Sequence, residues 1–178
     1  MSNHLSKFIS LILRHNPAAV GITVDEFGWA NVDALSKGIN SKGHAIDRQI
    51  LDEIVSSDNK GRYSYSEDNS LIRANQGHSI DVDLQLEPIQ PPDLLYHGTA
   101  TRLSSAIQEE GIKKMYRRFV HLSADVAIAR IVGGRHGKPM IFVVSAKAMY
   151  QDGIKFFQSK NGVWLVDYVD TKYLIARQ

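Results

Sequence analysis

The stretch that divides this chain reads Ile72-Arg73-Ala74-Asn75-Gln76-Gly77-His78-Ser79. It combines an arginine, a histidine, two amides, a hydroxyl and a glycine, which is too polar for a core. Because it lies where one compositional half ends and another begins, its side chains could face a cleft shared by two lobes. An arginine and a histidine in a cleft suit an anion, and a polar linker or the solvent face of a strand is the alternative.

The composition is that of an ordinary soluble globular protein, with 43% hydrophobic and 22% charged residues among 178. This length suffices for one full domain or two small ones. We expect neither a membrane span nor a signal peptide, because no long apolar run and no basic-then-apolar leader is present. The absence of cysteine excludes disulfides and thiolate metal sites, and it fits a reducing cytoplasm.

Basic residues gather in the second half of the chain. Residues 1–80 contain eight Lys and Arg against nine Asp and Glu, whereas residues 81–178 contain 13 against ten. Residues 113–138 alone hold seven basic side chains, and Asp125 is the one acid among them. This local positive charge favours a phosphate-bearing ligand, and a merely solvated basic face is the plainer alternative.

The first helix is predicted by an apolar stripe and ends at a proline. Its apolar residues have the i, i+3, i+4, i+7 spacing of one helix face: Leu5, Phe8, Ile9 and Ile12. Pro17 cannot continue the helix, so Arg14 and His15 lie in its last turn, where the helix dipole tolerates cations. These two side chains either face outward or simply cap the last carbonyls.

The rest of the first half reads as a strand, two helices and a hairpin. Residues 21–25 have the pattern of a short strand, and Asn31 and Asp47 are capping residues for two helices. Residues 62–66 and 70–74 flank a turn and form the hairpin. This order is that of a winged helix, but its third helix carries net negative charge and would be repelled by phosphates. If this lobe contacts nucleic acid, we therefore expect the contacts to come from the cations on its other face: Arg14, Arg62 and Arg73.

The second half reads as a strand-rich α+β domain behind a proline-rich joint at residues 88–92. We predict a helix over residues 101–110, which Gly111 ends, and a helix over residues 124–132, which Ser123 caps. Residues 133–137 read as a loop. Strands are predicted over residues 94–97, 119–122, 140–144, 155–158, 163–169 and 173–176.

Common nucleotide and metal sites are excluded by their missing motifs. The glycine-rich segment 133–139 lacks the Lys-Ser/Thr of a phosphate loop, no strand leads into a Gly-x-Gly-x-x-Gly turn, and no cluster of ligands resembles a metal cage. Two segments remain, and each places an imidazole, backbone amides and a hydroxyl at a strand end: Tyr96-His97-Gly98-Thr99 and Val120-His121-Leu122-Ser123. Such groups suit ribose hydroxyls and a carboxamide, and Ser123 at a helix N-terminus suits a pyrophosphate. Taken singly, a core histidine and an ordinary N-cap serine explain them as well.

The chain resembles the RNA 2′-phosphotransferases in seven segments that occur in order along almost its whole length. These segments are Leu13-Arg-His-Asn-Pro17, Gly28-Trp29, Ile72-Arg-Ala-Asn-Gln-Gly-His-Ser79, Tyr96-His-Gly-Thr99, Val120-His-Leu-Ser123, Val132-Gly-Gly-Arg-His-Gly-Lys-Pro139 and Asn161-Gly-Val-Trp164. The resemblance implies an α+β protein with a winged-helix RNA-binding lobe over residues 1–85. It also implies an ADP-ribosyltransferase-like mixed-sheet lobe over residues 86–178 that holds NAD⁺.

The resemblance also implies roles for individual residues. A catalytic tetrad falls on Arg14, His15, Arg73 and Arg135. Contacts to NAD⁺ fall on His97, Gly98, Thr99, His121, Leu122 and Ser123, and contacts to the RNA substrate on Gln76, His78 and Ser79. No metal is implied, and the strand near Val163 lacks the glutamate that commonly completes other ADP-ribosyltransferase sites. The implied setting is cytoplasmic RNA processing of the tRNA-splicing kind.

The implied reaction has two steps. An RNA 2′-phosphate attacks C1″ of the nicotinamide ribose and expels nicotinamide, and then the ribose O2″ attacks phosphorus. The products are RNA with a 2′-OH and ADP-ribose 1″,2″-cyclic phosphate. Two alternatives stay open: ADP-ribosylation of a terminal phosphate on RNA or DNA, and a non-catalytic module that binds RNA and a nucleotide.

Overall fold

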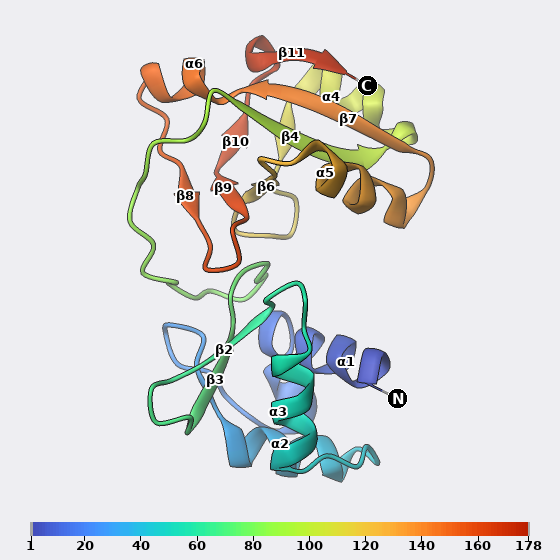
Figure 1. Cartoon of the computed structure of the whole chain (residues 1–178), viewed down its shortest axis with the longest axis vertical. Helices are drawn as coiled ribbons and strands as arrows, with labels where there is room; N and C mark the ends of the chain where they lie inside the picture. The colour runs from blue at the N-terminus through green and yellow to red at the C-terminus, as the bar shows by residue number, and fades with distance from the viewer. Residues whose placement is uncertain (1, 178) are drawn as a thin grey trace. The chain divides into compact units, whose positions relative to one another are not determined.

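The computed structural model describes residues 2–177, and the chain divides into two compact units, Met1–Gln85 and Leu86–Gln178. Each unit has its own hydrophobic core. Helices and small antiparallel sheets make up both units, so the chain is a mixed α and β protein (Figure 1). No helix within the described residues is long and apolar enough to cross a membrane.

The first unit begins with the predicted helix. Helix α1 (Ser2–Arg14) ends before Pro17, which starts the short 3-10 helix η1 (Pro17–Val20). Helices α2 (Val32–Ser41) and α3 (Arg48–Ser56) are confirmed together with their predicted caps. The Asn31 side chain accepts from the Ala34 backbone amide, and the Asp47 side chain accepts from that of Ile50.

The predicted hairpin is also confirmed, but the strand predicted over residues 21–25 is wrong. Strands β2 (Tyr63–Tyr65) and β3 (Leu71–Ala74) pair antiparallel, and β1 (Ala30–Asn31) pairs with the other edge of β3. The Asp25 carboxylate instead accepts hydrogen bonds from the Phe27 and Trp29 amides at 2.9 and 2.8 Å. This side-chain capping builds a tight turn and moves the first strand to Ala30–Asn31.

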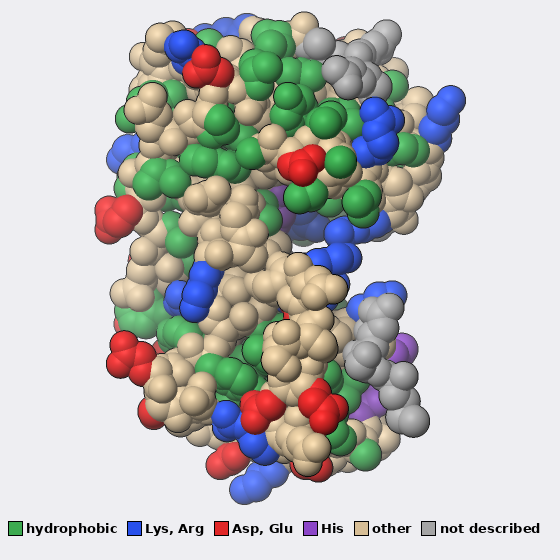
Figure 2. All heavy atoms as spheres, viewed as in Figure 1, with side chains coloured by type: hydrophobic (Ala, Val, Ile, Leu, Met, Phe, Trp, Pro, Cys, Tyr) green, Lys and Arg blue, Asp and Glu red, His purple; other side chains and the backbone are tan. Residues whose placement is uncertain are grey.

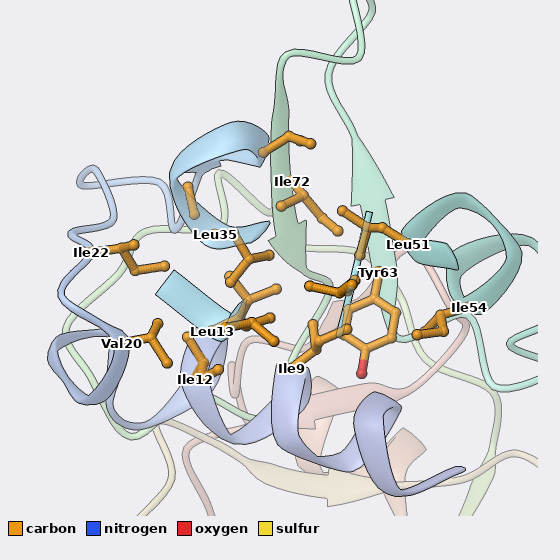
Figure 3. Close-up of a cluster of buried hydrophobic side chains, with 14 of the residues drawn as sticks. Ile9, Ile12, Leu13, Val20, Ile22, Leu35, Leu51, Ile54, Tyr63 and Ile72 are labelled. Atoms are coloured by element: carbon orange, nitrogen blue, oxygen red, sulfur yellow. The ribbon is translucent and has the colours of Figure 1, made fainter. Parts of the chain in front are cut away.

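Three helices and the sheet bury one core in the first unit. Figure 3 shows α1 side chains, among them Ile9 and Leu13, facing side chains of the other helices and of the strands. A methyl group at Gly38 of α2 would lie 2.3 Å from the Val20 carbonyl oxygen, so only glycine lets α2 approach η1 this closely.

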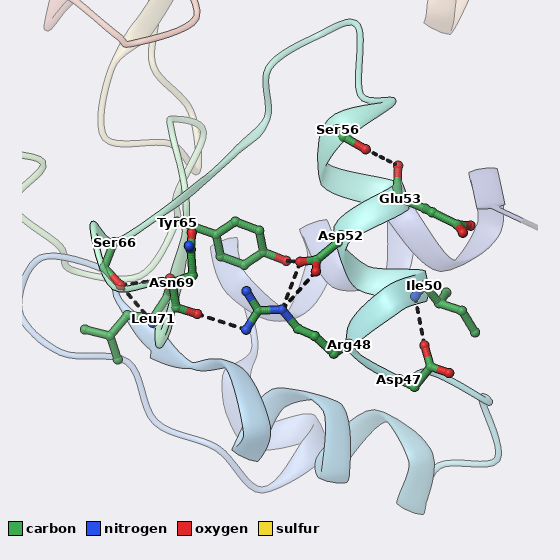
Figure 4. A network of polar contacts seen from close by, with 10 residues as sticks. All are labelled: Asp47, Arg48, Ile50, Asp52, Glu53, Ser56, Tyr65, Ser66, Asn69 and Leu71. Carbon is green, nitrogen blue, oxygen red and sulfur yellow. Dashed lines mark hydrogen bonds and ion pairs between the residues drawn. The ribbon is translucent and has the colours of Figure 1, made fainter.

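Polar contacts hold α3 against the hairpin (Figure 4). Arg48 Nε donates to Asp52 at 2.9 Å, its Nη1 donates to the Asn69 carbonyl at 3.0 Å, and its guanidinium lies over the Tyr65 ring at 5.0 Å. The Tyr65 hydroxyl donates to the same Asp52 carboxylate at 2.7 Å. The basic side chain of α3 is thus engaged in contacts within the unit.

The second unit contains three antiparallel sheets. Strands β4 (Leu94–Ala100), β7 (Pro139–Ser145) and β11 (Leu174–Arg177) form one in the order β11-β7-β4. The second, in the order β6-β9-β8, contains β6 (Val120–Leu122), β8 (Phe157–Gln158) and β9 (Trp164–Val166). The third pairs β5 (Ile112–Lys113) with β10 (Tyr168–Val169). The expected mixed sheet is wrong for the described residues, because every pairing of their strands is antiparallel.

The helices of the second unit differ from the prediction at their ends. Residues 101–110 form a 3-10 turn, η2 (Thr101–Leu103), and then α4 (Ser104–Glu110), which Gly111 ends as predicted. Helix α5 (Val126–Gly133) begins later than expected, and the predicted loop is a 3-10 turn, η3 (Gly134–His136). The remaining short helices are α6 (Ala146–Gln151) and η4 (Thr171–Tyr173).

Two glycines let α5 lie directly on β4. A methyl group at Gly98 would be 1.7 Å from the Ala129 carbonyl oxygen, and one at Gly133 would be 2.7 Å from that of Thr99. The neighbouring atoms are backbone and cannot move aside cheaply, so the contact requires glycine on both elements. The opposite face of α5 is apolar and exposed: Figure 2 shows hydrophobic side chains at the surface where α5 lies, and Ile131 is 65% exposed.

Candidate functional site

The predicted residues of the first unit gather where the end of α1 meets the segment after β3. The Ser79 amide donates to the Arg14 carbonyl at 3.0 Å, and the Ser79 hydroxyl lies 2.9 Å from His15 Nδ1. Gly77 has a φ of 89°, and a methyl group there would lie 3.6 Å from the Arg14 guanidinium. The fold therefore brings Arg14, His15 and Ser79 together, although 64 residues separate His15 from Ser79.

Arg73 is half-buried on β3 and is held by an aromatic ring. Its guanidinium lies 4.4 Å from the centre of the Trp29 ring, and its Nη1 donates a long hydrogen bond of 3.4 Å to the Phe27 carbonyl. Burial lowers the pKa of Arg73, and the nearby Asp25 carboxylate opposes that shift. No carboxylate within residues 2–177 lies within ion-pair distance of this guanidinium, which stays charged at neutral pH because its ordinary pKa is so high.

A partly desolvated guanidinium without a carboxylate suits an incoming anion. Its Nε is buried and has no hydrogen-bond partner among the described residues. A phosphate oxygen would supply both the missing hydrogen bond and the missing counter-charge. Arg62, the third cation expected to contact nucleic acid, differs from Arg73 because Asp58 pairs with it at 2.5 Å.

The other two predicted substrate residues lie in different surroundings. The Gln76 side-chain oxygen is buried, and among the described residues it has no hydrogen-bond partner. His78 is only 2% exposed and packs below the loop that contains Gly28, where a methyl group would lie 3.5 Å from its Nε2. The structure thus gives His78 a packing role in the support of that loop, and its contact with RNA stays a prediction.

The two predicted histidines of the second unit touch each other. The Nδ1 of His97 on β4 lies 3.1 Å from the backbone carbonyl oxygen of His121 on β6. A carbonyl can only accept, so Nδ1 carries the proton. Burial lowers the pKa of His97, which keeps the ring neutral and leaves Nε2 as a hydrogen-bond acceptor. That acceptor suits a hydroxyl donor such as one on a ribose.

Neighbours of these histidines mainly support the fold. Gly98 lies within β4 and gives α5 its close approach, and the Thr99 and Leu122 side chains are 7% and 2% exposed. Leu122 belongs to the core of the second unit. Their contacts with NAD⁺ stay predictions, and Leu122 could offer only its backbone.

Ser123 does not cap α5, so that prediction is wrong. Asp125 is the cap, because its carboxylate is a stronger acceptor and takes the amides of Ala127 and Ile128 at 2.6 and 3.3 Å. The Ser123 hydroxyl instead donates to the Asp125 carbonyl at 2.9 Å, and it accepts from the Asp125 amide. The argument for a pyrophosphate at the helix N-terminus fails, since the helix's own carboxylate occupies those amides.

Arg135 lies in η3, at the end of α5. A second arginine, Arg117, lies near enough to feel its charge. Arg117 Nη1 is 3.2 Å from His121 Nδ1. The packing of its guanidinium among protein atoms lowers the pKa of Arg117, and the charge of Arg135 lowers it further. Only the summed charge of residues 113–138 pointed to this residue, because no motif contains it.

A metal ligand set is not visible in the part of the chain that the structure describes. No group of three or more His, Asp or Glu side chains there could hold an ion.

Comparison with known proteins identifies the family. A model of the RNA 2′-phosphotransferase, Tpt1 / KptA family matches residues 1–168. A probable RNA 2′-phosphotransferase of Nostoc punctiforme is 51% identical over 96% of this chain and 94% of its own length. Another from Flavobacterium johnsoniae is 47% identical over 98% and 96%, and one from Fusobacterium nucleatum is 48% identical over 96% of each chain. The chain therefore belongs to the RNA 2′-phosphotransferase family, a family of transferases.

Proposed function

We propose that this protein removes an internal 2′-phosphate from RNA and consumes NAD⁺ as co-substrate. The observation that carries the proposal is the Arg73 guanidinium, which is half-buried, stacked on Trp29 and without a carboxylate among the described residues. Such a group is prepared for an anion, and the family of the chain supplies the identity of that anion as an RNA 2′-phosphate.

The first unit is proposed to hold the RNA. Its element order of helix, strand, two helices and hairpin supports a winged-helix arrangement. Arg14 and Arg73, together with Arg135 of the second unit, would balance the charge of the phosphate. The hydrogen bond between His15 and Ser79 orients the His15 imidazole, which would donate or shuttle a proton.

The second unit is proposed to be the ADP-ribosyltransferase-like part that binds NAD⁺. The residues present fit this co-substrate, because the neutral His97 offers an acceptor at Nε2 for a ribose hydroxyl. When bound, NAD⁺ supplies an electrophilic ribose carbon with nicotinamide as its leaving group. No side chain has to act as a base toward the nucleophile, since a phosphate is already an anion.

The proposed outcome follows from two displacements. The 2′-phosphate oxygen forms a bond to C1″ as the bond to nicotinamide breaks. The ribose O2″ then gives up its proton and forms a bond to phosphorus, as the RNA 2′-oxygen leaves and takes up a proton. Charge builds on the phosphoryl oxygens in the second step, where preorganised guanidinium groups stabilise it best. The products are 2′-OH RNA, nicotinamide and ADP-ribose 1″,2″-cyclic phosphate, and we place the reaction in cytoplasmic tRNA splicing and related RNA processing.

One incubation tests the proposal. The protein is mixed with NAD⁺ and an oligonucleotide that carries one internal 2′-phosphate, and the products are separated by chromatography. We expect nicotinamide and the cyclic phosphate in equal amounts. Nicotinamide with a stable ADP-ribosylated oligonucleotide would instead mean ADP-ribosyl transfer alone, and no nicotinamide at all would mean a binding module.

The same incubation with added EDTA tests whether the reaction is independent of metal ions, as we propose. Because guanidinium groups are proposed to balance the phosphate charge, turnover should persist in EDTA. Loss of turnover in EDTA that magnesium restores would contradict this part of the proposal.

A further inference from the structure

The side of α1 that faces away from the core carries rings and an apolar side chain. His4 is exposed, Leu11 is 50% exposed, and Phe8 is half-buried at the edge of the core of the first unit. The opposite side of the helix buries residues such as Ile9 and Leu13 completely. The outer face of a surface helix is ordinarily polar, so these outward side chains indicate a contact outside the core.

Four of the outward side chains form one line along the helix, which we call the α1 stripe: His4, Phe8, Leu11 and His15. They follow one another by four, three and four residues, which is the spacing of neighbours on one helix face. The His15 amide donates to the Leu11 carbonyl at 3.0 Å, so His15 continues the helical course beyond the end of α1. At about 1.5 Å per residue, the α1 stripe is about 16 Å long.

The α1 stripe connects the candidate site to a cluster of rings. At one end, the His15 ring contacts the Ser79 hydroxyl. At the other end, His44 from the loop between α2 and α3 lies against the stripe, with its ring centre 4.7 Å from that of Phe8 and 6.0 Å from that of His4. Figure 2 shows histidine side chains at the surface near the N-terminal end of the chain. A ligand held near His15 could therefore extend along α1 to these rings.

The charge beside the α1 stripe is positive. Residues 2–14 contain one lysine, one arginine and no acid, whereas α3 carries two acids and one arginine. Lys7 and Arg14 are seven residues apart and therefore lie on the same flank of the stripe, about two helical turns from each other. Lys7 is exposed, and no carboxylate in the described part of the chain forms an ion pair with it. A ligand along α1 thus meets one row of rings and apolar groups and a parallel row of cations.

We propose that the α1 stripe binds the single-stranded RNA that flanks the 2′-phosphate, with bases stacked on its rings and the RNA backbone beside Lys7. Single-stranded RNA has the complementary arrangement, because proteins bind its bases on aromatic side chains and its phosphates with cations. At about 3.4 Å for each stacked nucleotide, the stripe has the length of about five nucleotides. The identity of this ligand rests on the proposed function.

A second copy of the chain fits the α1 stripe less well. A symmetric pair would bring the same face of two copies together, and Lys7 and Arg14 of one copy would then meet the same cations of the other. Like charges across an interface disfavour association, whereas the phosphates of RNA balance these cations.

The dependence of affinity on RNA length tests the proposal. Oligonucleotides with one internal 2′-phosphate are extended stepwise, on the 5′ side in one series and on the 3′ side in the other. We expect the affinity of the wild-type protein to rise on one side only and to level off after about five nucleotides. Abasic nucleotides on that side should remove most of the gain, because they keep the phosphates and lack the bases. Affinity that does not change with length on either side would overturn the proposal.

Variants of the stripe separate stacking from charge. Phe8→Leu keeps an apolar contact with the core but removes a ring, and His44→Ala removes the neighbouring ring. Each should bind the long oligonucleotide about tenfold more weakly and the shortest one as wild type does. Lys7→Gln should reduce the slope of log affinity against log salt concentration by about one. Lys37→Gln removes an exposed lysine of α2 and is the matched control, which should change nothing.

Two results with these variants would contradict the proposal. Wild-type affinity of both ring variants for the long oligonucleotide would mean that no base stacks on the stripe. A wild-type salt dependence of Lys7→Gln would mean that the RNA backbone does not pass beside α1. Thermal melting of each variant shows whether it is folded, and Leu11→Gln, at an exposed position, repeats the affinity test without a change in the core.

Two further measurements separate the α1 stripe from the proposed activity and from self-association. Length-dependent binding without release of nicotinamide would refute the proposed activity and support the stripe, whereas turnover of the shortest oligonucleotide without any gain from length would do the reverse. Analytical ultracentrifugation compares wild type with Leu11→Gln. A wild-type dimer that this variant dissociates, with RNA affinity unchanged, would show a second copy on the stripe and overturn the proposal.

Discussion

The two units prepare their polar groups in contrasting ways. In the first, the Arg73 guanidinium loses part of its water shell and lies on Trp29, and no carboxylate of the described residues balances its charge. In the second, the polar groups are imidazoles: buried His97 is neutral and donates from Nδ1 to the His121 carbonyl, and Arg117 Nη1 lies 3.2 Å from the His121 Nδ1. The first arrangement is suited to a ligand with charge, and the second to a ligand with hydroxyl and amide groups.

The difference teaches that burial has opposite consequences for the two residue types. An arginine remains charged when partly buried, because its ordinary pKa is far above neutrality, so burial increases its attraction to an anion. A histidine loses its charge instead, and it becomes a directional donor and acceptor. The same physical effect therefore yields two kinds of binding group in one chain.

The largest effect is expected for the charge-conserving substitutions Arg73→Lys and Arg135→Lys. Each keeps the charge but removes the planar fork that binds two phosphate oxygens, so kcat should fall about 100-fold. Rates of single turnover with 2′-phosphorylated RNA measure the loss. Arg102→Lys is the control and should keep nearly full activity.

The double variant sharpens this test. If both guanidinium groups act on one phosphoryl centre, Arg73→Lys and Arg135→Lys together should cost less than the sum of the single losses in free energy. Losses that simply add would mean that the two arginines act independently, and Arg135 would then be a solvated cation of η3.

A smaller effect is expected on the stability of the second unit alone. Gly133→Ala would place a methyl group 2.7 Å from the Thr99 carbonyl oxygen, which should lower the free energy of unfolding by about 1–3 kcal/mol. Gly134→Ala is the matched control, because nothing lies within 4 Å of its added methyl group. Each unit has one tryptophan, Trp29 or Trp164, so fluorescence of a Trp29→Phe background follows the second unit. Equal melting temperatures for the two alanine variants would refute the close packing of α5 on β4.

Trp29→Leu tests how the first unit holds its cation. Loss of the ring beneath Arg73 removes an interaction of about 0.5–2 kcal/mol, so turnover should fall about fivefold, and Trp29→Phe should lose less. Tyr65→Leu removes a similar contact with Arg48 outside the site, so it should lower stability without lowering turnover. Equal turnover of Trp29→Leu and wild type would show that the ring does not position Arg73.

The smallest expected effect is on the stability of the protein at acidic pH. Burial lowers the pKa of His97 in the folded protein, so below the ordinary value of about 6.5 the unfolded chain binds a proton that the folded chain does not. The stability from this residue is complete above that value and is lost as the pH falls toward the folded pKa. His97→Asn keeps a donor for the His121 carbonyl but cannot titrate. Its urea midpoint should fall less than that of wild type between pH 7.5 and 5.5, and identical falls would contradict the account.

Local sequence patterns predicted most of the elements, because caps and apolar stripes act over a few residues. Asn31 and Asp47 cap their helices as expected, and Pro17 follows the end of α1. Two of the errors arose where an aspartate side chain took backbone amides that the sequence pattern had assigned differently. Asp25 drew nearby amides into a turn in place of a strand, and Asp125 displaced Ser123 as the cap of α5.

The sequence motifs predicted residues of the candidate site, but they did not predict the contacts between those residues. Sequence reasoning indicated His97 and His121, but their mutual hydrogen bond joins residues 24 apart and depends on how β4 and β6 lie. Arg117 was missed because only its contact with the His121 ring nitrogen distinguishes it from the other basic residues of this stretch. His78 has the residue type of a ligand contact, yet the fold buries it under the loop at Gly28.

The division of labour between the units is the central claim, and paired affinities of single variants test it most directly. NAD⁺ and a 2′-phosphorylated oligonucleotide are titrated separately into Arg73→Lys, His97→Ala and Ser123→Ala. We predict that His97→Ala weakens NAD⁺ binding about tenfold and leaves RNA binding unchanged, whereas Arg73→Lys weakens RNA binding and leaves NAD⁺ binding unchanged. The effect of Ser123→Ala is expected to be smaller, because its hydroxyl bonds to the Asp125 backbone. Equal loss of both affinities in His97→Ala would contradict the claim.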